Sequence, residues 1–94
     1  MSPSSEPERV VALPDDVDLH ARPAAAFVRA AMAYDAQVTV AAGDREADAK
    51  SLLSVLALGA KRGTLLRLRA AGADAAKAVD GLADLVAGLV ETPV

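Results

Sequence analysis

The stretch Asp18-Leu19-His20-Ala21-Arg22-Pro23-Ala24 lies where a β-type run gives way to a helical pattern, and it holds the only histidine of the chain. Pro23 suits the first turn of a helix, because the backbone N–H that it lacks would have no partner there. Neutral imidazole is a nucleophile near pH 7. The unpaired N–H groups of a helix N-terminus, with Arg22 beside them, favour an anion such as phosphate. This stretch therefore predicts a site for transient phosphorylation of His20.

Most single histidines in a chain are surface or loop residues without a specific function, and this is the alternative interpretation of His20. Three local features argue against it. His20 lies at a strand-to-helix connection, where ligand-binding groups are common. Arg22 follows two residues later. No acidic residue lies between His20 and Asp35, whereas Arg22 and Arg29 do, so the local field favours an anion.

The pattern on either side of this stretch alternates between strand and helix periods. Residues 9–13, 37–41, 45–49 and 64–70 are predicted to be strands, and helices are expected after Pro23, over 52–58 and after Asp74. The order β-α-β-β-α-β-α predicts an α+β fold with one mainly antiparallel, four-stranded sheet and three helices on one of its faces. The charged run 45–49 suits an edge position in this sheet.

Helix limits and buried faces are also predicted. Ser51 and Asp74 are expected N-caps. The first helix should end near Tyr34-Asp35, and the last helix at Thr92-Pro93. The residues expected to face the core at the helix period are Ala24, Phe27, Val28 and Ala31 in the first helix, and Ala75, Ala78, Val79, Leu82, Val86 and Leu89 in the last. In the strand 64–70, Leu66 and Leu68 share one face, and Leu65, Arg67 and Arg69 share the other.

Composition restricts the class of protein. A chain of 94 residues indicates one domain, expected over residues 9–91 after a disordered tail of residues 1–8. The chain has no cysteine, so disulfides are excluded, and with a single histidine a structural zinc site is not expected. A net charge of −3 without blocks of like charge argues against nucleic-acid binding. Without a long apolar run or a signal-peptide pattern, we expect a cytoplasmic protein that binds no membrane.

The run Leu52–Leu58 has more apolar residues than one buried stripe requires. Two interpretations follow from this surplus. The helix is deep in the core, or it buries Val55 and Leu58 while Leu53 and Leu56 face binding partners.

Residues Leu19–Ala24 resemble the phosphorylation-site motif of HPr, the histidine-containing phosphocarrier family of the sugar phosphotransferase system. Residues Lys50–Gly59 resemble the second signature of that family, around its regulatory serine. The 31 positions from His20 to Ser51 match the family's spacing, and Gly72-Ala73-Asp74 before the last helix also fits. The resemblance extends from about Arg9 to about Leu89, and it implies an open-faced β-sandwich of HPr type.

The resemblance implies a phosphoryl carrier rather than an enzyme with its own turnover. His20 would accept a phosphoryl group on Nδ1 from phosphorylated enzyme I, itself charged by phosphoenolpyruvate, and pass it to enzyme IIA domains of sugar permeases. Arg22 would neutralise the phosphate, and Pro23 would fix the start of the helix. The protein would be a monomer without metal or cofactor. The docking surface for enzyme I and enzyme IIA would consist of Arg29, Leu52, Leu53 and Leu56.

Ser51 has two interpretations. It is an ordinary N-cap, or it is also the family's regulatory serine. In the second case HPr kinase/phosphorylase and a transcriptional regulator become further partners. The added phosphate would place negative charge on the docking surface and oppose binding.

Asp18 departs from the resemblance, because the family usually has glycine two residues before the histidine. Its carboxylate could repel a phosphate on His20, cap the following helix or pair with Arg22. Two alternative functions also remain. One is a nitrogen-regulatory HPr paralogue with the same chemistry and other partners. The other is a non-catalytic regulatory binding protein on the same fold, controlled through Ser51. The presence of His20 and Arg22 argues against the latter.

Overall fold

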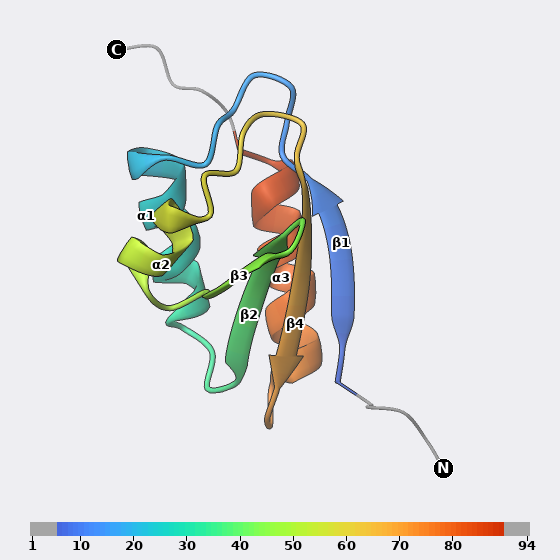
Figure 1. The fold of residues 1–94 in the computed structure, drawn as a ribbon. Helices are drawn as coiled ribbons and strands as arrows, with labels where there is room; N and C mark the ends of the chain where they lie inside the picture. Colours follow the sequence, from blue (N-terminus) through green and yellow to red (C-terminus); the bar gives the residue numbers. More distant parts are fainter. Residues whose placement is uncertain (1–5, 90–94) are drawn as a thin grey trace.

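A computed structural model of the chain describes residues 6–89. The elements follow in the order β1 (Glu8–Ala12), α1 (Ala21–Ala31), β2 (Gln37–Ala42), β3 (Arg45–Asp48), α2 (Leu52–Ala57), β4 (Leu65–Ala71) and α3 (Ala75–Ala87). Figure 1 shows α1 and α2 side by side at one edge of the molecule, with α3 behind the sheet. The predicted order β-α-β-β-α-β-α is confirmed.

The four strands form one antiparallel sheet in the order β1-β4-β2-β3. The charged strand β3 lies at an edge, as its composition predicts. β4 and β2 form the centre, where Leu68 lies opposite Val40 and Ala70 opposite Val38. Because side chains alternate along a strand, these four residues share one face, and all of them are buried.

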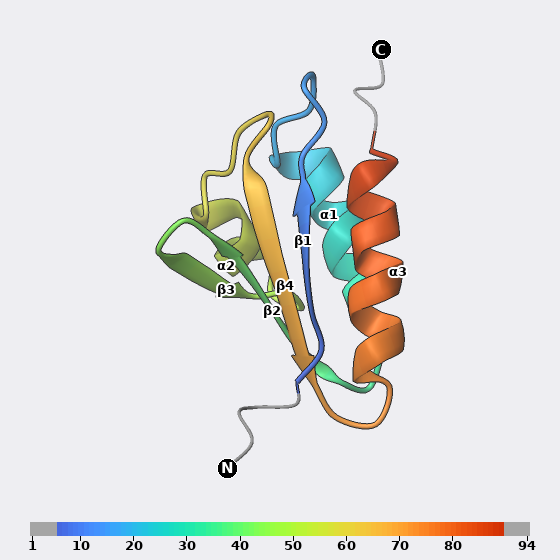
Figure 2. The same cartoon turned by 90° about the vertical axis from the view of Figure 1, so that its right-hand side faces the viewer.

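The core lies between this face of the sheet and the helices. Figure 2 shows α1 and α3 next to each other on one side of the strands. Phe27 is the one aromatic side chain that is fully buried, and its neighbours in the core are aliphatic. The four core positions predicted for α1 and five of the six predicted for α3 are buried, while Leu89 is half-buried. The opposite face of the sheet carries Arg67 and Arg69, which share that face as predicted and are exposed.

The ends of two helices differ from the predictions by several residues. α1 ends at Ala31 and not near Tyr34-Asp35, because the N–H groups of Ala33 and Tyr34 bond three residues back and tighten the chain into turns. α3 ends at Ala87, where the Gly88 N–H bonds to the carbonyls of Asp84 and Leu85. The predicted stop at Thr92-Pro93 lies outside the described residues.

Glu8 is the first residue of β1 and pairs with Arg69, although the sequence analysis assigned it to the tail. Residues 1–5 of that tail lie outside the described residues, as does the predicted domain end at residue 91. The domain limits 9–91 therefore stay a prediction.

The two predicted N-caps behave differently. Ser51 caps α2, since its hydroxyl oxygen accepts a hydrogen bond from the Ser54 N–H at 3.3 Å. Asp74 occupies the N-cap position of α3 but makes no side-chain bond to that helix. Its carboxylate instead accepts hydrogen bonds from the backbone N–H groups of Asp35 and Ala36. The prediction that the Asp74 side chain caps the helix is therefore wrong, because the carboxylate is hydrogen-bonded to the loop after α1 instead.

Candidate functional site

His20 occupies the N-cap position of α1 and is exposed. Its backbone is extended, with φ −117° and ψ −161°, and its carbonyl accepts the first helical bond from the Ala24 N–H at 2.9 Å. The imidazole makes no capping bond to the helix. His20 is thus held at the start of the helix by a backbone hydrogen bond, and its imidazole ring takes no part in capping the helix.

The first turn of α1 provides the anion-binding features that the sequence predicts. It contains no acidic residue, and Arg22, its second residue, is exposed. Pro23, the third residue, is buried against the core and anchors the turn. The positive end of the helix dipole and the Arg22 guanidinium therefore lie on the same exposed helix end as His20.

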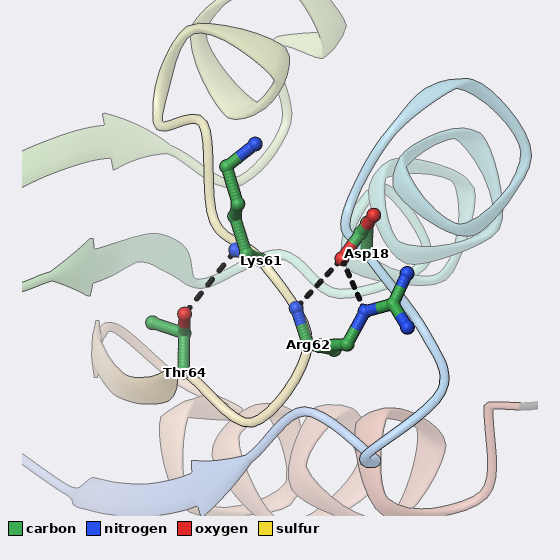
Figure 3. A network of polar contacts seen from close by, with 4 residues as sticks. All are labelled: Asp18, Lys61, Arg62 and Thr64. Carbon is green, nitrogen blue, oxygen red and sulfur yellow. Dashed lines mark hydrogen bonds and ion pairs between the residues drawn. The ribbon is translucent and has the colours of Figure 1, made fainter.

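Asp18, which stands where the family usually has glycine, interacts with a distant loop (Figure 3). Its Oδ1 accepts a hydrogen bond from the Arg62 backbone N–H at 2.8 Å and lies 3.5 Å from the Arg62 Nε. The carboxylate therefore pairs with Arg62, not with Arg22, and makes no capping bond to α1. Of the alternatives left open for Asp18, capping of α1 and pairing with Arg22 are not observed, because tertiary contact supplies a partner 44 residues away.

The bond from the Arg62 N–H is the main cause that lowers the pKa of Asp18 below its usual value, although burial opposes this shift. The side-chain bond from Arg62, the Arg62 charge and the charge of a protonated His20 lower this pKa further. Asp18 also needs no glycine-type backbone, since no residue other than glycine has a positive φ in residues 6–89. Aspartate at this position is therefore compatible with the turn before α1.

Ser51 lies at the far end of α2 from His20. The Lys50 Nζ donates to the Tyr34 carbonyl at 2.7 Å, which places the start of α2 beside the end of α1. Three residues beyond the other end of α2, the Ala60 carbonyl accepts a hydrogen bond from the Leu19 N–H at 2.9 Å. The two helices therefore run in opposite directions, and the structure does not bring Ser51 to the His20 turn.

The apolar surplus of α2 is partly exposed. Leu53 is 82% exposed and Leu52 40%, whereas Val55 and Leu58 are buried. Leu56 is half-buried and packs against the core, so it is less available than the sequence indicated. The interpretation that α2 is wholly buried is wrong, and the interpretation that it presents leucines outward is confirmed for Leu53.

Met32, which was not among the residues expected in the docking surface, is 64% exposed at the C-cap of α1. Arg29, in the last turn of α1, is also exposed. The available signal was spacing: residues three apart share a helix face, and Met32 follows Arg29 by three. Both residues lie at the end of α1 that adjoins the start of α2, and so at the same end as Leu52 and Leu53.

Within the part of the chain that the structure describes, no group of three or more histidine, cysteine or acidic side chains is placed to hold a metal ion. None of the helices there has the length and apolarity to cross a membrane.

The α+β fold of this topology, with an exposed histidine at the N-terminus of α1, is compatible with the class of phosphocarrier proteins. The family model described as "PTS HPr component phosphorylation site" matches residues 7–88. The chain belongs to the HPr family, the phosphocarrier proteins of the phosphotransferase system. It is accordingly a phosphoryl carrier and not an enzyme with its own turnover.

Relatives and solved structures agree with this assignment. The phosphocarrier protein HPr of Vibrio cholerae is 40% identical over 79 residues, which cover 84% of this chain and 93% of the relative. The phosphocarrier protein HPr of Streptomyces coelicolor is 48% identical over 77 residues, which cover 80% and 83% of the two chains. The crystal structure of a phosphocarrier protein HPr from Bacillus anthracis superposes with a TM-score of 0.83 at 28% identity, covering 88% of this chain and 99% of that one.

Proposed function

We propose that His20 is the residue that carries the phosphoryl group. The observation that supports this most strongly is its position. The imidazole is exposed at the N-cap of α1, Arg22 lies two residues away, and the first turn has no acidic residue to repel an anion. Of residues 6–89, His20 is the one histidine, so the described part of the chain offers no second candidate for a phosphohistidine.

The chemistry is a phosphoryl exchange between two histidines. Nδ1 of neutral His20 attacks the phosphorus of phosphorylated enzyme I, a new N–P bond forms and the N–P bond in the donor breaks. The leaving imidazole takes up the electron pair of that bond. Arg22 neutralises charge on the transferring phosphoryl oxygens, and the reverse sequence delivers the group to an enzyme IIA domain. Such a transfer depends mainly on positioning and charge neutralisation.

The phosphoryl group is held weakly, which suits a carrier. A helix N-terminus stabilises an exposed anion by only about 0.3–1 kcal/mol. Salt screens the exposed charges of Arg22 and the phosphate further. Neither interaction is strong enough to trap the phosphohistidine, so the group passes on once a partner has docked.

The partners, enzyme I and enzyme IIA, bind through what we call the docking surface: Arg29, Met32, Leu52, Leu53 and the exposed part of Leu56. Three of the five large apolar side chains that are exposed in residues 6–89 belong to it. Exposed apolar groups beside a cation fit a partner whose contact area is apolar with an acidic rim. We propose that this exchange takes place in the cytoplasm.

Ser51 supports a regulatory role through its place beside this surface. Its hydroxyl caps α2, and a phosphate there would meet the N-terminal end of the helix, so the fold would tolerate it. The added charge would oppose an acidic partner. We expect Ser51→Asp to stay folded and to bind enzyme I more weakly, with Ser51→Thr, which keeps the capping oxygen, as the control. HPr kinase/phosphorylase is the partner that this role requires, and a transcriptional regulator is the further partner of the phosphoserine form.

The decisive test of the function uses phosphoenolpyruvate labelled in its phosphoryl group, together with enzyme I. The chain should take up label that is labile in acid and stable in base, as phosphohistidine is. His20→Ala should take up none. Label that persists in this variant would overturn the assignment of His20.

The same assay separates the alternative functions. A nitrogen-regulatory paralogue would exchange phosphate with its own enzyme I paralogue much faster than with the enzyme I of sugar transport. A non-catalytic regulator controlled through Ser51 would take up no label from either enzyme, although it would still bind partners.

A further inference from the structure

Two loops that are distant in the sequence run together beside His20. The loop before α1 and the loop after α2 are joined by backbone hydrogen bonds from Leu13 N–H to the Thr64 carbonyl at 2.9 Å and from Gly63 N–H to the Leu13 carbonyl at 3.1 Å. Nearer the site, the Leu19 N–H donates to the Ala60 carbonyl at 2.9 Å. The segment that precedes His20 is thus hydrogen-bonded along its length to the segment that follows α2.

Asp18, two residues before His20, adds a side-chain hydrogen bond between these two loops. Its Oδ1 accepts from the Arg62 N–H at 2.8 Å, while the contact with the Arg62 Nε is longer, 3.5 Å. The Arg62 side chain is 64% exposed. An exposed ion pair at this distance contributes little, so the bond to the backbone N–H is the stronger link.

The position of His20 follows directly from that of Asp18. The His20 N–H donates to the Asp18 carbonyl at 2.9 Å, which closes a tight turn around Leu19. The Leu19 side chain is buried, so the centre of the turn is fixed in the core. Both Asp18 and Leu19 are therefore tied to residues 60–62, and the orientation of His20 at the start of α1 depends on these ties.

We propose that Asp18 is a positioning residue for phosphoryl transfer at His20, acting through its hydrogen bond to the Arg62 backbone N–H. The inference rests on the proposed role of His20. Glycine, the usual residue here in the family, offers no side-chain acceptor, so this link is additional in the present chain. It couples the loop that follows α2 to the start of α1, and α2 is the helix that carries part of the docking surface. A partner seated on α2 is thereby held in register with the imidazole.

The test measures the rate of phosphoryl transfer to this chain at saturating and at limiting concentrations of phosphorylated enzyme I. Loosening a reacting group by a fraction of an ångström slows transfer, and we expect Asp18→Ala to lower the saturated rate about five- to tenfold. The KM for enzyme I should stay the same, because the docking surface is intact. Asp18→Asn keeps an Oδ1 acceptor for the Arg62 N–H and should restore the rate to within about twofold of the wild type. Asp18→Gly is the second variant if Asp18→Ala does not fold.

Two controls isolate the bond. Arg62→Ala removes the guanidinium but keeps the backbone N–H, so its rate should equal that of the wild type. Asp80→Ala removes an exposed aspartate–arginine pair between α3 and β1, where Asp80 meets Arg9, and should also have no effect.

Each outcome decides one question. If the wild type is labelled at His20 and Asp18→Ala and Asp18→Gly transfer at the wild-type rate, the positioning role is wrong while the function stands. The proposal is also overturned if Arg62→Ala transfers as slowly as Asp18→Ala, or if Asp18→Asn does not restore the rate. Either result would mean that the charges of Asp18 and Arg62, and not the hydrogen bond to the Arg62 N–H, control the rate. If the wild type takes up no label, the proposed function itself fails.

Discussion

The carboxylate of Asp74 accepts a hydrogen bond of 2.8 Å from the backbone N–H of Ala36, 38 residues earlier in the chain. A second bond, 2.9 Å long, comes from the Asp35 N–H. Ala36 is also approached by Gly72, which has φ +129°, and a Cβ at Gly72 would lie 3.1 Å from the Ala36 Cα. The link between α1 and β2 is therefore held by the Asp74 carboxylate and packed against Gly72, a glycine that tolerates both the close approach and the backbone angle.

We expect stability to depend on the ionisation of Asp74. The Asp35 N–H chiefly lowers the pKa of Asp74, burial opposes the shift, and the Ala36 N–H and the Lys50 charge lower it further. A carboxyl whose pKa is lower in the folded protein contributes stability that is complete above its unfolded pKa of about 3.9 and is lost as pH falls through the folded value. Thermal unfolding followed by circular dichroism should show Asp74→Asn melting several degrees below the wild type at pH 7. The two curves should converge in acid, once the pH has fallen below the lowered pKa of folded Asp74. An equal gap at every pH would contradict an ionised role.

Leu53→Glu should weaken partner binding without unfolding the protein. The side chain is 82% exposed, so the substitution should change the free energy of unfolding by no more than about 0.5 kcal/mol. The charge would fall in the apolar part of the docking surface, and we expect the Kd for enzyme I to rise at least about tenfold. Leu65→Glu is the matched control: Leu65 is 60% exposed on the uncovered face of the sheet, and its variant should bind normally. Titration calorimetry measures both. Equal losses of affinity would mean that the docking surface is misplaced.

Arg22 and Arg29 should affect different steps of the transfer. In the proposed transfer Arg22 neutralises the phosphoryl group, so Arg22→Ala should lower the saturated transfer rate about tenfold, equivalent to ~1.4 kcal/mol in the barrier. Arg29 lies at the docking surface, and Arg29→Ala should mainly raise the KM for enzyme I, more strongly at low salt. Rapid-quench kinetics over a range of donor concentrations separate the two effects. An unchanged saturated rate in Arg22→Ala would rule out its role in charge neutralisation.

Gly81, inside α3, is expected to resist replacement by alanine. Alanine in a helix interior is usually more stable than glycine by about 1 kcal/mol. Here a Cβ would collide with the Tyr34 hydroxyl oxygen, and the Tyr34 Cζ would lie at 3.3 Å. Gly81→Ala should therefore lower Tm in the wild type, whereas in the Tyr34→Phe background the loss should shrink or change sign. The double-mutant cycle should give a coupling of about 1 kcal/mol. Additive effects of the two substitutions would show that the contact is not strained.

Most of the fold could be predicted from patterns among neighbouring residues. The alternation at Leu66 and Leu68, the helix period at Phe27 and Val28 and the cap at Ser51 are all as predicted. Element limits were less accurate: α1 stops several residues early, and β1 takes in Glu8. Ends of this kind depend on which carbonyls the last N–H groups can reach, and hydrophobic periodicity does not encode that.

The sequence by itself determined the element order, the buried faces and the candidate nucleophile with its arginine and proline, because each of these follows from residues within a few positions of one another. Only the tertiary structure decided which loops meet. It turned the carboxylates of Asp18 and Asp74 to backbone N–H groups 44 and 38 residues away, and it brought the end of α1, which carries Met32, to the start of α2, which carries Leu53. A carboxylate accepts from any N–H that packing brings to it, so its partner is set by the path of the whole chain.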